Sequence, residues 1–200
     1  MWPPMLRPRC DTEPMADTTD TTDPTDKTDP TDLSALSDRL ALASVAFEAF
    51  RPAVEAGDPW PLSEAYGTEP ESDWGPKEVL AHTAEMLGYW PVQIDHILAG
   101  GPEPVPFGRV STDPERIERI GRDRELPTAE LFGRVATEAS RLATRIRSLS
   151  ATDTARRGLH PRLGEMTVGR IVDRFLVGHL EDHVEQLRAI LATRRSTSPG

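Results

Sequence analysis

The fold is decided by a stretch near the C-terminus, which reads TVGRIVDRFLVGHLEDHVEQLRAIL from residue 167 to residue 191. Its apolar residues recur every three or four positions, which is the spacing of one face of an α-helix. His179 and His183 stand on this same face. Its apolar members are Val168, Ile171, Val172, Phe175, Leu176, Leu187 and Ile190. We therefore predict a helix from Thr167, a good N-cap residue, to about residue 193, with two histidines turned toward the core.

Three further stretches show the same helical periodicity. The predicted helices cover residues 33–57, 76–98 and 127–149, and a short polar helix covers residues 113–122. No window shows sustained two-residue alternation, so we predict essentially no sheet. Amphipathic helices of about 35–40 Å suit an all-α four-helix bundle. The long loops between them allow a crossover connection.

The N-terminal segment has a different composition. Residues 17–32 read DTTDTTDPTDKTDPTD, with an aspartate at every third position and no apolar side chain to bury. Such a segment cannot offset the entropy lost on ordering. We predict a disordered acidic tail over residues 1–32 and one helical domain over residues 33–195.

Charge and cysteine content exclude several classes of protein. The formal net charge is -10, which argues against nucleic acid or an anionic membrane surface as a partner. No apolar run reaches the roughly 18–20 residues needed to cross a bilayer. The single cysteine, Cys10, cannot form an intramolecular disulfide, so a reducing cytoplasm is the expected location.

A third histidine interrupts the apolar face of the predicted helix over residues 76–98. His82 falls among Val79, Met86, Leu87, Trp90, Ile94 and Ile97. Because His179 and His183 are four residues apart, their imidazoles project from one face, one turn apart. Buried neutral imidazoles without partners are costly, and one metal ion would satisfy all three. This pattern predicts a divalent metal bound by His82, His179 and His183.

Other interpretations of the histidines stay open. They could be partly buried residues bonded to carboxylates or to the backbone, in a bundle that holds no metal. A zincin is excluded, because that motif needs a glutamate directly after its first histidine, where this chain has Leu180. His96 is too far along the helix from His82 to join the site, and His160 lies in a loop, so both are expected to be structural or exposed.

The motifs resemble a known family. The segment WGPKEVLAH, residues 74–82, followed by His179-x-x-x-His183-x-x-Gln186-Leu187, is similar to the DinB/YfiT-like superfamily, which includes DinB-type damage-inducible proteins and mycothiol-dependent maleylpyruvate isomerases. The resemblance covers about residues 33–193. It implies a four-helix bundle with a crossover connection and a divalent metal held by His82, His179 and His183.

The same resemblance bears on the reaction. The isomerase branch usually has a glutamate where this chain has His179, so the resemblance favours the general DinB-like branch. Many members of the family use low-molecular-weight thiols, and members are often homodimers. The composition, with 21 arginines against 2 lysines, indicates a GC-rich host in which that thiol would be mycothiol.

The chemistry expected of the site follows from its ligands. The expected metal is a divalent cation, with zinc the first choice and nickel, iron or manganese as alternatives. Because three neutral imidazoles add no negative charge, the cation keeps its full charge and can lower the pKa of a bound thiol. We expect a metal-dependent thiol S-transferase acting on a small electrophile, with a non-catalytic metal- or ligand-binding bundle in a stress response as the alternative. Outer partners of the ligands are expected at Glu85, Asp182 and Gln186.

Overall fold

The structure of the chain is a computed structural model that describes residues 32–64 and 71–197. The tail predicted over residues 1–32 therefore lies, except for Asp32, outside the described residues. The helices and strands in chain order are α1 (Leu33–Glu48), α2 (Arg51–Glu55), η1 (Glu71–Asp73), α3 (Pro76–Ala99), β1 (Val105–Pro106), α4 (Pro114–Asp123), α5 (Thr128–Ser148), α6 (Ala151–Ala155), β2 (Arg157–His160), β3 (Gly164–Thr167), α7 (Val168–Ile171), η2 (Val172–Gly178) and α8 (His179–Thr197).

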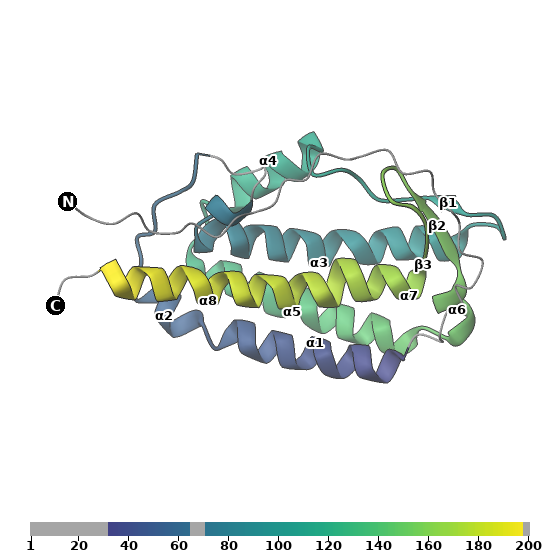
Figure 1. The fold of residues 1–200 in the computed structure, drawn as a ribbon, viewed down its shortest axis with the longest axis horizontal. Helices are drawn as coiled ribbons and strands as arrows, with labels where there is room; N and C mark the ends of the chain where they lie inside the picture. The colour runs from purple at the N-terminus through teal and green to yellow at the C-terminus, as the bar shows by residue number, and fades with distance from the viewer. Residues whose placement is uncertain (1–31, 65–70, 198–200) are drawn as a thin grey trace, which may run out of the picture.

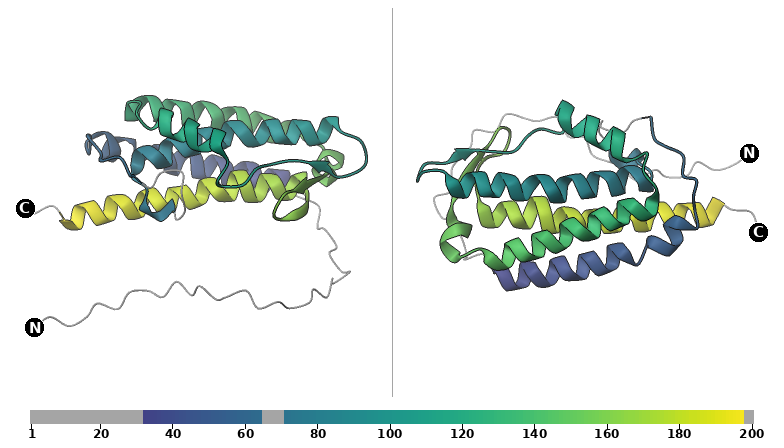
Figure 2. Two further views of the ribbon diagram at one scale, coloured as in Figure 1. Left: turned by 90° about the horizontal axis from the view of Figure 1, so that it is seen from above. Right: turned by 180° about the vertical axis from the view of Figure 1, so that it is seen from behind.

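Four long helical segments hold most of the described residues, which confirms the predominantly helical prediction. They are α1, α3, α5 and the continuous run α7–η2–α8, and they lie side by side (Figure 1). Helix α1 contacts α5 and α8, and α3 contacts the same two helices. Seen from behind, α5 lies between α3 and α1 (Figure 2). The buried apolar side chains form one core between these helices.

The first predicted helix is shorter than expected. Asp32 caps α1 by accepting the backbone N–H groups of Ser34 and Ala35, but the helix ends at Glu48, and α2 starts after a break. The cause is Pro52, which cannot donate a helical hydrogen bond and whose ring clashes with the carbonyl four residues earlier. The continuous helix predicted over residues 33–57 was therefore wrong.

The prediction of no sheet was also wrong. Strands β1, β2 and β3 form a three-stranded sheet in that order, with β1 parallel to β2 and β2 antiparallel to β3. Strand β2 has no alternation of apolar and polar residues, because its buried positions hold Gly158 and His160 while Leu159 is 45% exposed. Its sequence therefore does not indicate a strand. The sheet sits where α3 ends and α7 begins (Figure 1).

The last predicted helix is divided by a π-helical segment. Thr167 caps it as predicted, by accepting the N–H of Arg170, and the chain passes through η2 before it returns to α-helix at His179. A π segment holds more residues per turn, so it changes the direction in which the following side chains point. The two histidines of α8 come directly after this change. No helix among residues 32–64 and 71–197 is long and apolar enough to cross a membrane.

Candidate metal centre

The structure brings the three predicted histidines together from two helices. His82 comes from α3, and His179 and His183 come from α8. The Nε2 atoms of His82 and His179 are 3.1 Å apart. The ring centroids of His179 and His183 are 4.5 Å apart, and those of His82 and His183 are 5.1 Å apart. All three imidazoles therefore converge on one point between α3 and α8.

A fourth side chain, which the sequence did not point to, joins this group. Glu71 lies in η1, and one of its carboxylate oxygens lies within 4.8 Å of a nitrogen of each of the three histidines, as those nitrogens do of one another. Its carboxylate also accepts a hydrogen bond from Arg116 of α4, at 2.5 Å. Glu71 belongs to no helix with periodic apolar spacing, so only the path of the loop before α3 reveals it.

Burial keeps the histidines uncharged. It lowers the pKa of His179 to about 4, and the charge of Arg116 adds to the effect. Burial, followed by the neighbouring His179, lowers the pKa of His183 to about 3. Burial and the other two imidazoles also lower the pKa of His82 well below its ordinary value. At neutral pH all three rings are therefore neutral and can offer a lone pair to a cation.

Gln186 decides which nitrogen of His183 carries the proton. Its side-chain amide donates to the backbone carbonyl of Glu71 at 2.6 Å, so its carbonyl oxygen must be the atom that faces Nδ1 of His183, at 2.8 Å. A carbonyl oxygen only accepts, so Nδ1 carries the hydrogen and Nε2 keeps its lone pair. Gln186, expected from the sequence as an outer partner, thus lies against the ring of His183.

The other two predicted outer partners behave differently. Glu85 is buried, pairs with Arg109, and has its second oxygen 3.9 Å from Nδ1 of His82. That distance is too long for a hydrogen bond, and neither atom has a hydrogen-bond partner among the described residues, so Glu85 does not fix the tautomer of His82 here. Asp182 is exposed, and within the described part of the chain it forms no hydrogen bond to the three imidazoles.

These residues fit a bound divalent cation. Nε2 of His183 is buried and has no hydrogen-bond partner among the described residues, although an orphaned buried nitrogen is costly. Zinc at about 2.0–2.1 Å from each ligand would need ligand atoms no more than about 4.2 Å apart. The observed span of 4.8 Å would close with side-chain movements of less than about 1 Å. This cluster of three imidazoles and a carboxylate, in which His82 and His183 are buried and Glu71 and His179 half-buried, is thus a candidate metal centre.

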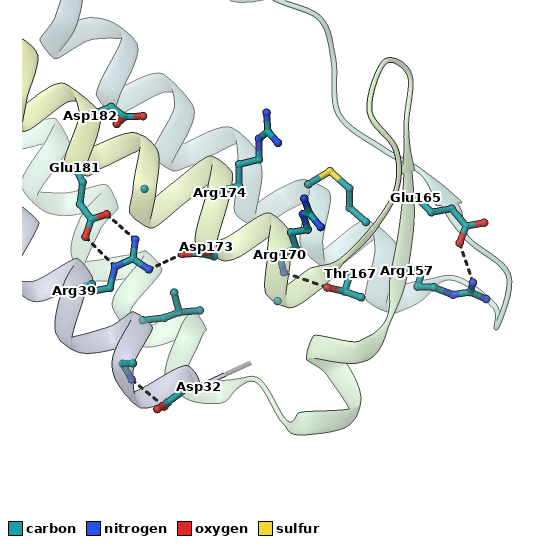
Figure 3. A pocket seen from close by; sticks show the side chains of 15 residues that line it. Asp32, Arg39, Arg157, Glu165, Thr167, Arg170, Asp173, Arg174, Glu181 and Asp182 are labelled. Carbon is teal, nitrogen blue, oxygen red and sulfur yellow. Dashed lines mark hydrogen bonds and ion pairs between the residues drawn. The ribbon is translucent and has the colours of Figure 1, made fainter. Parts of the chain in front are cut away.

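The cluster opens into a pocket of about 550 Å³. Its walls come from α3, α4, the turn between β2 and β3, and the η2–α8 segment. Trp90 and Phe175 line it with their rings stacked at 4.4 Å. A larger groove of about 1030 Å³ adjoins this pocket at Arg174 and Asp182, and in it Arg39 pairs with Asp173 and Glu181 (Figure 3). It holds none of the three histidines.

The two remaining histidines lie outside the cluster, as expected, although His160 lies in β2 and not in a loop. His96 is exposed near the end of α3. His160 is buried, and its Nδ1 accepts the backbone N–H groups of Arg162 and Leu163 at 3.2 and 3.3 Å. It therefore fixes the turn between β2 and β3, and its ring lines the pocket.

The fold and the site together define a mostly helical protein with a buried histidine and glutamate group suited to a metal ion. A family model of the DinB superfamily matches residues 33–187. The chain belongs to the DinB superfamily, as the sequence motifs predicted. A search among curated proteins finds no match.

Proposed function

We propose that this chain is a divalent-metal-dependent enzyme that transfers a thiol of the mycothiol type to a small electrophile. The observation that supports the proposal best is the convergence of three neutral imidazoles and one carboxylate at a pocket large enough for a small molecule. The DinB-type helical scaffold, which we take to be a four-helix bundle with a crossover connection, would hold these ligands on separate elements.

The ligands would be His82, His179 and His183, with Glu71 as a fourth. Imidazole and carboxylate ligands suit zinc first, and also nickel, iron or manganese. A divalent cation bound there would supply Lewis acidity that lowers the pKa of a thiol.

The protein's own residues would position the reactants. Gln186 holds His183 in the tautomer that presents Nε2, and Trp74 packs edge-on against His82 at 5.3 Å between ring centroids. The stacked rings of Trp90 and Phe175 would exclude water from one wall of the pocket. In the transfer, the thiolate sulfur bonds to the electrophilic carbon, the leaving group departs with its electron pair, and the thiol proton passes to solvent.

The proposal includes the setting of the reaction. The partner would be a small molecule, because a net charge of -10 disfavours nucleic acid and anionic membranes. A low-molecular-weight thiol would be at hand in a reducing cytoplasm. The proposal includes a homodimer as the state in which the chain works.

Thiol consumption tests the proposal directly. Protein loaded with zinc is incubated with mycothiol, or with N-acetylcysteine as a simpler thiol, and a set of chloronitrobenzene electrophiles, and the loss of free thiol is followed. We expect a zinc-dependent rate that His82→Ala lowers by about 100-fold or more and that His96→Ala leaves unchanged. Equal rates for His82→Ala and the parent would contradict the mechanism, and zinc binding without thiol consumption would support the binding-module alternative.

A further inference from the structure

The pocket beside the histidines contains two arginines that no acidic group neutralises. Arg109 and Arg116 also line it, but they pair with Glu85 and Glu71. Arg162 and Arg174 form no ion pair with any residue of the described ranges. Asp182 is the remaining acid that lines the pocket. Together with Glu85, which pairs with Arg109 from outside the lining, the charged side chains of the pocket carry one net positive charge before any metal is counted.

The two unneutralised arginines approach the pocket from different elements. Arg162 lies in the turn between β2 and β3, which the buried ring of His160 holds through two backbone N–H groups. Arg174 comes from η2 and lines both this pocket and the larger groove (Figure 3). Burial lowers the pKa of His160, and the charges of Arg162 and Arg174 add to this effect. Both arginines line the same pocket as His160.

Apolar surface lines the pocket as well. Trp90 and Phe175 stack at 4.4 Å, and the ring of His160 stacks on Phe175 at 5.6 Å. Met86 also faces this space. A molecule that lies in the pocket would meet the metal ligands, an aromatic surface and two guanidinium groups without an ion pair among the described residues, of which that of Arg174 lies 5.9 Å from the centre of the Phe175 ring. Guanidinium groups bind carboxylates and related acids with paired N–H donors.

From this arrangement we infer that the electrophile is an organic anion with an apolar body, whose acidic group is held by Arg162 and Arg174 and whose body lies on Trp90 and Phe175. The inference rests on the proposed function in taking this pocket as the substrate site. The binding of the anion itself depends on the two arginines and not on thiol chemistry.

A matched pair of probes tests this inference. The full-length chain is titrated calorimetrically with 1-naphthoate and with its neutral amide, 1-naphthamide, both with and without one equivalent of zinc. The variants are Arg162→Gln, Arg174→Gln and the double substitution. Arg170→Gln is the matched control, because Arg170 lies one helical turn before Arg174 and lines the larger groove but not this pocket.

We expect naphthoate to bind several-fold more tightly than naphthamide. Partly exposed charge pairs are individually weak, so each single variant should weaken naphthoate about twofold to fivefold, and the double variant about tenfold. Naphthamide binding should not change, and Arg170→Gln should behave as the parent does.

Several results would overturn the inference. They are equal affinity for the two probes, no saturable naphthoate binding, naphthoate affinity retained in the double variant, or an equal loss in Arg170→Gln. Failure of the proposed function would look different. In that case zinc would not bind or thiol would not be consumed, while the arginine-dependent preference for naphthoate would remain in the zinc-free titrations.

Discussion

At the scale of single residues, Gln186 joins two parts of the site that are far apart in the sequence. One end of its amide faces the ring of His183, and the other end holds the backbone of Glu71. It thus fixes a ligand tautomer on α8 and also fixes the short segment that supplies the carboxylate. Outer hydrogen bonds of this kind orient metal ligands and raise their basicity.

Replacing Gln186 should therefore weaken metal binding without removing a ligand. We expect Gln186→Leu to lower zinc affinity by about 10-fold to 100-fold, measured by competition with a chromophoric chelator. Gln93→Leu makes the same chemical change on α3, where the amide oxygen accepts the N–H of Gly108 at 2.9 Å, and should leave zinc affinity within about twofold of the parent. Identical affinities for the parent and Gln186→Leu would show that Gln186 does not orient His183.

The residues of the site were unequally visible in the sequence. His82, His179 and His183 interrupt apolar stripes, so periodicity alone singled them out. Glu71 lies eleven positions before His82, in the short helix η1, and its place in the cluster depends on contacts with Gln186 and Arg116 from distant parts of the chain. Arg162 and Arg174 could not be selected from among 21 arginines, because their unpaired state depends on where every acidic side chain lies.

At the scale of elements, the small sheet contributes His160 of β2 to the pocket wall. Gly108, two residues after β1, packs closely against His160 and against Trp90 of α3. This residue has a positive φ of 78°, and an added Cβ would lie 2.7 Å from Cδ2 of His160 and 3.3 Å from Trp90. Only glycine combines that backbone conformation with such close contact.

The substitution Gly108→Ala should accordingly destabilise the protein by about 2–4 kcal/mol, from the left-handed backbone and from overpacking together. Gly164→Ala is the control, because Gly164 has a φ of 73° but no atom within 4 Å of an added Cβ. It should cost only about 1–2 kcal/mol. Urea unfolding at neutral pH measures the free energy of unfolding of both variants. An equal decrease in the two would mean that the neighbouring His160 and Trp90 leave room for a Cβ at residue 108.

The helices were easier to predict than the strands. Stripes of apolar side chains predicted α3 and the last helix. Their starts could also be predicted, at Pro76 and at the cap residue Thr167, because a proline or a cap acts on its own helix end and needs no distant contact. The break before Pro52 was missed because the apolar spacing continues across it. The π segment was missed because its residues keep a helical pattern, and β2 was missed because Gly158 and His160 take the buried positions.

At the scale of the whole molecule, the buried histidines make stability depend on pH. In the folded chain the pKa values of His179 and His183 are about 4 and about 3, whereas in the unfolded chain they return to about 6.5. Above pH 6.5 the rings are neutral in both states. Below it the unfolded chain binds protons that the folded chain does not, so the free energy of unfolding falls as the pH falls toward 4.

We expect this loss to amount to roughly 1 kcal/mol per pH unit for each buried histidine. This decrease in the free energy of unfolding is measured by urea unfolding at about pH 7.5 and about pH 5, in the presence of a chelator. Most carboxylates titrate below this pH interval. His179→Gln should lose less stability over this interval than the parent. His96→Gln, whose ring is exposed, should lose as much as the parent, and the same loss in both variants would exclude the buried histidines as the cause.

The central claim is that His82, His179 and His183, with Glu71, hold one metal ion. Its most direct test is elemental analysis of chain purified without a histidine tag, reloaded with zinc, nickel or manganese and freed of excess metal. We expect about one equivalent per chain, retained in His96→Ala and lost in His82→Ala and His183→Ala. Less than about 0.2 equivalents of every metal in the parent, or full occupancy in His183→Ala, would contradict it.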